Sequence, residues 1–273
     1  MKRMSAFNVT SLTLGFAFLY LPMVLLIIYS FNESKLVTVW AGFSTKWYGE
    51  LLRDEAFLDA AWVTLKVAVI SSTFATVLGT MAAYVLVNSG RFLGRTLFSG
   101  MIYAPLVMPE VITGLSLLLL FIGIGLDRGV LTIVLAHTTF SMCYVSVVVS
   151  SRLVSFDRSL EEAALDLGCS RFDAFRLVTL PIIAPAVISG WLLAFTLSLD
   201  DLVIASFVAG PSSTTLPIKI WSAVRLGVTP EINALSTIMI GIVTVGVISA
   251  SLISKRKAVR DAADIRAAER ATA

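Results

Sequence analysis

The sequence predicts a polytopic membrane protein that crosses the bilayer several times as helices. Hydrophobic residues make up 57% of its 273 residues, and charged residues only 14%. A soluble domain of ordinary composition carries about a quarter charged residues. The apolar residues also gather in long runs, and a bilayer core about 30 Å thick requires about 20 consecutive apolar residues of a helix. Low charge and long apolar runs together indicate this class.

Six apolar runs are long enough to be membrane spans. They cover residues 10–31, 61–87, 100–124, 130–151, 184–208 and 233–254. The first run follows Lys2 and Arg3, as the apolar region of a signal peptide would. It is too long for such a region, however, and no small-residue cleavage site follows it. We therefore expect a retained first helix.

The distribution of Lys and Arg predicts that both termini are cytoplasmic. With the N-terminus inside, 14 of the 21 Lys and Arg residues lie in cytoplasmic segments, six lie in outer loops and Lys66 lies within the second run. Cytoplasmic segments of membrane proteins carry such an excess. Residues 255–273 are then a cytoplasmic tail. The net charge of +3 reflects membrane topology and does not indicate nucleic-acid binding.

The chain carries no motif of a self-contained enzyme. It lacks a Gly-Lys-Ser/Thr phosphate loop, a His-Glu-x-x-His metal motif and a Gly-x-Ser-x-Gly nucleophile motif. Its one histidine, His137, lies in the fourth run, where histidines more often hydrogen-bond between packed helices. Cys143 and Cys169 fall in different environments and lack metal-ligand spacing. We therefore expect no cofactor, metal or catalytic residue, and a partner must supply any energy.

A cytoplasmic segment between the fourth and fifth runs predicts a compact pair of helices. Ser159 and Glu162 have the spacing of a capping box that begins a first helix. Gly168 is placed to end that helix in a left-handed turn. Ser170 and Asp173 repeat the cap and begin a second helix that continues into the fifth span. An ordinary amphipathic helix at the membrane surface has the same periodicity, so periodicity alone leaves that alternative open.

The residue pattern of this segment, 157–180, resembles a known signature. Glu162, Ala163 and Ala164 are followed by Gly168 and then by Val178-x-Leu180-Pro181. This order resembles the signature of permease subunits of ABC importers, which usually has Ile at the position of Val178. Small side chains at both alanines would leave the surface low enough for close approach by another protein. The resemblance implies a coupling helix that docks on an ATPase subunit through Glu161, Glu162, Ala163, Ala164 and Gly168.

Three further stretches resemble the permeases of polyamine importers, such as those of putrescine systems. They are "YSFNESKLVTVWAGFSTKWYGELL", "APLVMPEVITGLSLLLLF" and "SGWLLAFTLSLDDLVIASFVAGP". The resemblance covers about residues 14–254, and the very short outer turn "GIGLDRG" departs from it. It implies an all-α permease of the type I ABC importer fold, one domain over residues 1–273, in which spans two to six form the core. It also implies a bacterial inner membrane, a second and different permease chain, ATP-binding cassette ATPase subunits and a periplasmic substrate-binding protein.

Three acidic residues lie deep in the predicted spans: Glu110, Asp200 and Asp201. Each such residue costs about 2.5–3.5 kcal/mol even on the scale of insertion experiments. They could pair with a buried cation, for which this chain offers only Lys66, or they could bind a cationic substrate in a pathway. The second interpretation agrees with the polyamine resemblance. On a continuous helix adjacent residues point about 100° apart, so we expect only one of the two aspartates to face the pathway squarely.

Prolines and aromatic residues accompany these acids. Pro105 and Pro109 each remove a helical hydrogen bond, which predicts irregular backbone in the third span. Tyr103, Trp191 and Phe195 are candidate pathway walls, because aromatic faces attract ammonium groups. Aromatic residues at helical spacing more often pack against other helices, so both interpretations stay open.

These observations predict the permease subunit of an ATP-driven polyamine importer, with putrescine as the expected solute and alternating access as the mechanism. Two alternatives remain. One is a permease of the same importer class for a different solute, although three pathway acids disfavour an anion. The other is a proton-coupled secondary transporter that uses Asp200 and Asp201 as a relay, against which the coupling-helix signature argues.

Overall fold

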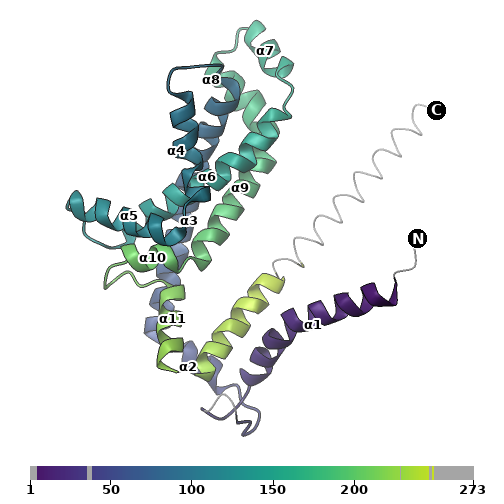
Figure 1. Ribbon diagram of the computed structural model, residues 1–273, viewed down its shortest axis with the longest axis vertical. Helices are drawn as coiled ribbons and strands as arrows, with labels where there is room; N and C mark the ends of the chain where they lie inside the picture. Colours follow the sequence, from purple (N-terminus) through teal and green to yellow (C-terminus); the bar gives the residue numbers. More distant parts are fainter. Residues whose placement is uncertain (1–4, 36–38, 228, 246–247, 249–273) are drawn as a thin grey trace. The chain divides into compact units, whose positions relative to one another are not determined.

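A computed structural model describes residues 5–35, 39–227, 229–245 and 248, and these residues form an all-α protein. The predicted fold class is thus confirmed. The elements are α1 (Ala6–Tyr29), α2 (Lys46–Leu51), α3 (Glu55–Asn88), α4 (Arg95–Val107), α5 (Glu110–Gly123), α6 (Val130–Val154), α7 (Ser159–Asp166), α8 (Arg171–Ala174), the π-helix η1 (Phe175–Thr179), α9 (Leu180–Asp200), α10 (Val203–Val208) and α11 (Leu216–Leu226) (Figure 1). A further apolar helix covers Pro230–Val245.

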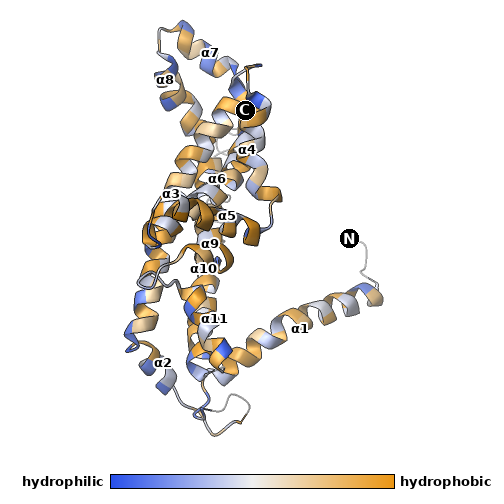
Figure 2. Cartoon of the chain, turned by 60° about the vertical axis from the view of Figure 1, so that its left-hand side comes forward, coloured by the Kyte–Doolittle hydropathy of each residue, from blue (hydrophilic) through white to orange (hydrophobic). Residues whose placement is uncertain are grey.

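Within the described residues, four helices are long and apolar enough to cross a membrane, and the bent pair α4–α5 makes a fifth candidate. The four are Phe7–Ser30, Glu55–Asn88, Val130–Val154 and Arg171–Asp200. Hydrophobic residues dominate along these helices (Figure 2). The last predicted run and the predicted tail, 255–273, extend beyond the described residues. The count of six spans and the single permease domain therefore stay predictions.

The chain divides into two compact units. One contains the residues up to Glu55 and from Ala223 onward, and the other is Ala56–Ser222. In the first unit a buried asparagine organises the segment after α1. Asn32 donates from Nδ2 to the carbonyl of Val39 (2.8 Å), and its own carbonyl accepts from Nε1 of Trp47 (2.7 Å). The candidate site residues lie in the second unit.

The third predicted span is broken, with α4 and α5 bent by 118°. We predicted one continuous run over residues 100–124, with irregular backbone near its prolines. The break lies at Met108 and Pro109, and Met108 is extended (φ −75°, ψ 137°), because the proline ring disfavours helical backbone in the preceding residue. Pro105 stays inside α4, so only the second proline ends a helix.

The fifth predicted span is also interrupted, contrary to the continuous run 184–208 that the sequence suggested. Helix α9 ends at Asp200, and Asp201 has extended backbone (φ −65°, ψ 119°). The carboxylate of Asp201 then accepts hydrogen bonds from the backbone N–H groups of Ile204 (3.3 Å) and Ala205 (2.7 Å). A carboxylate that accepts the free N–H groups of a first turn stabilises a helix start. Asp201 therefore stabilises the start of α10, which begins at Val203, instead of continuing α9.

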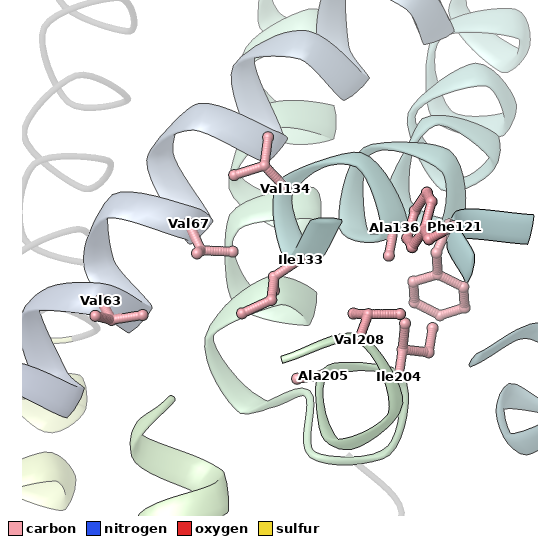
Figure 3. Close-up of a cluster of buried hydrophobic side chains, with 10 residues drawn as sticks. Val63, Val67, Phe121, Ile133, Val134, Ala136, Ile204, Ala205 and Val208 are labelled. Atoms are coloured by element: carbon pink, nitrogen blue, oxygen red, sulfur yellow. The ribbon is translucent and has the colours of Figure 1, made fainter. Parts of the chain in front are cut away.

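Small residues and a buried apolar cluster hold the second unit together. The cluster joins α3, α5, α6 and α10 through Val63, Val67, Phe121, Ile133, Val134, Ala136, Ile204, Ala205 and Val208, with Phe140 of α6 completing it (Figure 3). Gly114 of α5 lies so close to α10 that a Cβ there would be 2.7 Å from Cδ2 of Phe207. Lipid tails are as apolar as leucine, so close packing at small residues, not burial from water, drives helix association in a bilayer.

Two arginines cap the C-terminal end of α3. Arg95 donates from Nη2 to the carbonyl of Leu86 (2.7 Å), and Arg158 donates from Nη2 to the carbonyl of Val87 (2.7 Å). The last carbonyls of a helix have no partner within it, and a guanidinium can supply one. The end of α3 is thus fixed to the segments that carry α4 and α7.

Candidate functional site

The turn between α7 and α8 has the geometry predicted for Gly168. This glycine has φ +89°. Its N–H donates to the carbonyl of Leu165 (2.9 Å), and the N–H of Cys169 donates to the carbonyl of Ala164 (3.1 Å). These two bonds form a Schellman motif, which requires a left-handed residue that glycine adopts without strain. The predicted end of the first helix is confirmed.

Of the two predicted helix caps in this segment, one is present. Ser170 accepts the N–H of Asp173 at Oγ (3.1 Å), as expected for the start of α8. The capping box at Ser159 was wrong, because Ser159 is itself helical and Arg158 is the N-cap residue. Asp157 instead accepts the N–H of Ser159 (3.0 Å). Hydrogen bonds from the side chain and the backbone of Ser159 lower the pKa of the Asp157 carboxyl. Asp157 therefore caps the start of this segment in place of Ser159.

Glu161 ties this helix pair to the rest of the unit. Its Oε1 accepts from the hydroxyl of Tyr84 on α3 (2.7 Å), and its Oε2 accepts from the hydroxyl of Thr179 on η1 (3.0 Å). A cavity of about 990 Å³ lies beside it, between α3 and the segment α7–η1, and Tyr84 and Phe175 are among its lining residues. Both carboxylate oxygens are therefore used to hold α7 in place.

The outward surface of the pair, which we call the α7–α8 knob (residues 157–174), carries exposed apolar side chains. Glu162 and Ala163 are exposed, but Ala164 is buried, so only one of the two alanines lies on the surface as predicted. Leu167 is 86% exposed and Phe172 is 68% exposed. These two side chains thus leave apolar surface uncovered on a segment outside the predicted spans.

The three predicted intramembrane acids occupy different environments. Asp201 is buried, with its side chain 7% exposed, and its Oδ2 lies 3.0 Å from Nε2 of His137 on α6. Asp200, the last residue of α9, is exposed in this chain. Glu110, the first residue of α5, is also exposed, at a helix end where the backbone dipole favours a negative charge.

Lys66 forms no ion pair with Asp201 in this structure, although the ion-pair alternative allowed that contact. Its Nζ lies 5.6 Å from the centre of the Trp62 ring on the same helix. His137, which we predicted to hydrogen-bond between packed helices, contacts both Asp201 and the hydroxyl of Ser198 (2.7 Å from Nδ1). The sequence did not predict that the histidine and the acid are partners, because they are far apart in the chain.

Two of the three predicted aromatic residues lie together. The rings of Trp191 and Phe195 on α9 are stacked, with centres 5.2 Å apart, and Nε1 of Trp191 donates to the hydroxyl of Thr73 on α3 (3.2 Å). Tyr103 packs instead against the buried cluster at Leu86 and Ile102. The packing interpretation fits Tyr103, and the stacked pair presents ring faces along α9.

Ser71 and Ser198 also belong to this group of polar residues, and the sequence alone did not indicate them. Ser198 lies three residues before Asp201, so both fall on one side of a helical turn, and this spacing is the signal that could have indicated it. Ser71 of α3 donates to the hydroxyl of Ser198 (3.2 Å). A chain of four polar side chains therefore links α3, α9 and α6 to the start of α10.

Long apolar helices, two interrupted spans packed on each other and the helix pair α7–α8 define a membrane transport subunit. Residues 75–266 match the family described as "Binding-protein-dependent transport system inner membrane component". The chain belongs to this family.

Named relatives cover nearly the whole chain. It is 59% identical to the putrescine transport system permease protein PotI of Escherichia coli (strain K12), covering 94% of this chain and 95% of that protein. It is 43% identical to the spermidine/putrescine transport system permease protein PotC of the same strain, covering 93% and 96%.

Solved structures share the fold. A chain of a bacterial ABC transporter involved in the import of the acidic polysaccharide alginate superposes with a TM-score of 0.71, covering 92% of this chain and 98% of that chain. Their sequences are only 16% identical, so this similarity concerns the fold alone.

Proposed function

We propose that this chain is the transmembrane permease subunit of an ATP-driven polyamine importer, forms half of the translocation pathway by alternating access, and carries putrescine. The observation that carries the proposal is the 59% identity to PotI, a permease named for putrescine, over nearly the whole chain. The fold does not decide the solute, since a permease that imports an acidic polysaccharide shares it.

The exposed acids suit a diamine, which has two ammonium groups on an apolar spacer. Asp200 at the end of α9 and Glu110 at the start of α5 are exposed and lie on separate elements. The two ammonium groups of the diamine therefore need not bind the same carboxylate. The stacked rings of Trp191 and Phe195, on the same helix as Asp200, offer faces for cation–π contacts. Asp201 does not take part, because its carboxylate already accepts hydrogen bonds from its own chain.

The remaining partners follow from the same proposal. ATP-binding cassette ATPase subunits bind the α7–α8 knob at Leu167 and Phe172. A second, different permease completes the pathway, and a periplasmic binding protein delivers the solute. A solved relative in complex with its periplasmic protein, with a TM-score of 0.68, supports this arrangement. The membrane is the bacterial inner membrane, and both termini are cytoplasmic. Affinity purification of the chain from its native membrane tests the partner set.

Replacement of each aspartate separately tests the pathway. Asp200→Asn should lower putrescine uptake per assembled complex at least about tenfold, because removal of an attraction of about 1.4 kcal/mol has that effect. Asp201→Asn should instead lower the amount of assembled complex, because it disturbs a buried hydrogen-bond network. Asp127→Asn, at an exposed acid of the outer turn, is the control and should behave as wild type.

The outcomes separate the alternatives. Wild-type uptake by an assembled Asp200→Asn complex contradicts the pathway role of this acid. If the wild-type complex takes up a different solute, the importer class stands and the assignment of a polyamine as the solute is wrong. Uptake in vesicles that lack the ATPase identifies a secondary transporter.

A further inference from the structure

The carboxylate of Asp201 receives three hydrogen bonds at the interruption between α9 and α10. Oδ2 accepts from Nε2 of His137 (3.0 Å) and from the N–H of Ala205 (2.7 Å), and Oδ1 accepts from the N–H of Ile204 (3.3 Å). One of the three donors thus lies on α6, and two lie on α10. The carboxylate joins the start of α10 to a helix that packs along α9.

The donors and acceptors of this network match when His137 is neutral with its proton on Nε2. Nε2 then donates to Asp201, and Nδ1 accepts from the hydroxyl of Ser198 (2.7 Å). The hydroxyl of Ser198 accepts in turn from Ser71 (3.2 Å). Both His137 and Ser198 are buried, with 2% and 3% of their surfaces exposed. A buried network in which every polar group has a partner rigidifies its surroundings, whereas one broken link leaves costly unpaired groups.

We propose that His137 is a positioning residue, which holds the interruption between α9 and α10 through Asp201 and thereby orients Asp200. The role of Asp200 rests on the proposed function. Asp200 is the last helical residue and is joined directly to Asp201. If Asp201 is released, α9 can continue by further residues, each of which turns about 100° around the helix axis. The bond to His137 opposes that extension and so fixes the direction in which Asp200 points.

Two amide substitutions of His137 separate its two hydrogen bonds. In His137→Gln the amide nitrogen reaches the place of Nε2 and can donate to Asp201. In His137→Asn the shorter amide replaces Nδ1 and can bond Ser198, but it does not reach Asp201. Thr139→Val, at a half-buried α6 residue whose hydroxyl donates to the carbonyl of Leu135 (2.8 Å), is the matched control.

We expect the Asn variant to lose putrescine uptake per assembled complex by about tenfold, or about 1.4 kcal/mol, because Asp201 loses its hydrogen bond from α6. Amide hydrogen exchange over residues 203–208 should rise in the same variant. The Gln variant and Thr139→Val should retain uptake within about threefold, a difference of less than 1 kcal/mol, and their exchange should be that of wild type.

Equal loss of uptake in the Gln and Asn variants, or unchanged exchange of α10 in the Asn variant, overturns the proposal. If the Asn variant does not assemble, recovery of assembly and uptake by Gln supports the proposal, and failure of Gln to recover them overturns it. Hydrogen exchange does not depend on the solute. If wild type fails to transport polyamines while α10 exchange still separates the two variants, the proposed function fails and the positioning role stands.

Discussion

Gly168 combines a left-handed backbone with open space around it. Its φ is +89°, and nothing lies within 4 Å of the place that a Cβ would take. A side chain there therefore meets no clash, and the penalty is backbone strain of about 1–2 kcal/mol. That strain acts on the turn between Leu167, at the end of α7, and Phe172, in α8.

We predict that Gly168→Val lowers co-purification of ATPase subunits and lowers uptake, because a strained turn misplaces the α7–α8 knob. Gly94→Val is the matched control. Gly94 has nearly the same φ, +85°, and equally open surroundings, but it lies before α4 and outside the knob. Pull-down with a tagged chain measures both variants. Equal retention of ATPase subunits by both variants contradicts the coupling role.

The sequence predicted the polar residues of the site better than their pairing. The chain places Asp200 and Asp201 next to each other, and helical geometry required that they point apart. Which one faces outward depends on where α9 ends, and neither glycine nor proline marks that end. At that end Asp201 accepts N–H groups of α10 and, in the positioning role proposed above, is held by His137 from another helix. A contact between residues 137 and 201 leaves no local pattern in the sequence.

Helices α5 and α10 pack as a pair of short elements, each of which follows an interruption of a span. They lie side by side (Figure 1) and meet at Gly114, where a Cβ would come within 3.3 Å of Cα of Ile204 and 2.7 Å of the Phe207 ring. At that distance the backbone of α5 cannot shift toward α10 without displacing it. The two interrupted spans therefore pack directly against each other at this glycine.

We predict that Gly114→Ala destabilises the purified complex by about 1–3 kcal/mol, the usual effect of overpacking. Gly123→Ala is the control in the same helix, since nothing lies within 4 Å of its Cβ position. Thermal unfolding in detergent should show a lower Tm for the first variant only. A Tm equal to wild type for Gly114→Ala would show that Phe207 turns away freely.

At the level of elements, local chemistry predicted some boundaries and tertiary contacts set others. Pro109 predicted irregular backbone because it lacks an N–H, and the break lies there. The start of α8 followed from Ser170, whose hydroxyl reaches the N–H of Asp173. The start of α7 did not follow from Ser159, since Asp157 lies close enough to accept its N–H first. Two capping residues within three positions compete, and spacing alone does not decide between them.

Orientation of the whole chain in the membrane is measurable with its two native cysteines. Cys169 lies at the turn of the knob and is partly exposed, whereas Cys143 is buried within α6. We predict that a membrane-impermeant maleimide labels the chain in inside-out vesicles and not in right-side-out vesicles. Cys169→Ser should abolish the labelling, and denatured protein provides the control for total thiol. Labelling from the periplasmic side contradicts cytoplasmic termini.

The class of the whole molecule was predictable because it follows from composition and run length, which bilayer thickness constrains directly. The solute was not predictable from the fold, since the alginate importer has the same fold at 16% identity. In the function proposed above, substrate choice depends on a few exposed side chains such as Asp200 and Glu110. Their environment in this chain depends on where α9 ends and α5 begins, which composition does not determine.

Arg95 and Arg158 at the end of α3 have two separate roles, one during membrane insertion and one in the folded protein. In the proposed orientation, with both termini in the cytoplasm, their charge contributes during insertion to the retention of their loops on that side. In the folded protein, the forked shape of the guanidinium, and not only its charge, matters, because Arg95 reaches the carbonyls of Gly90 (3.3 Å) and Leu86 (2.7 Å) together. Lysine at either position would keep the insertion signal and lose the geometry of the helix end. Correct topology and a correctly ended helix are thus separable properties of the same two side chains.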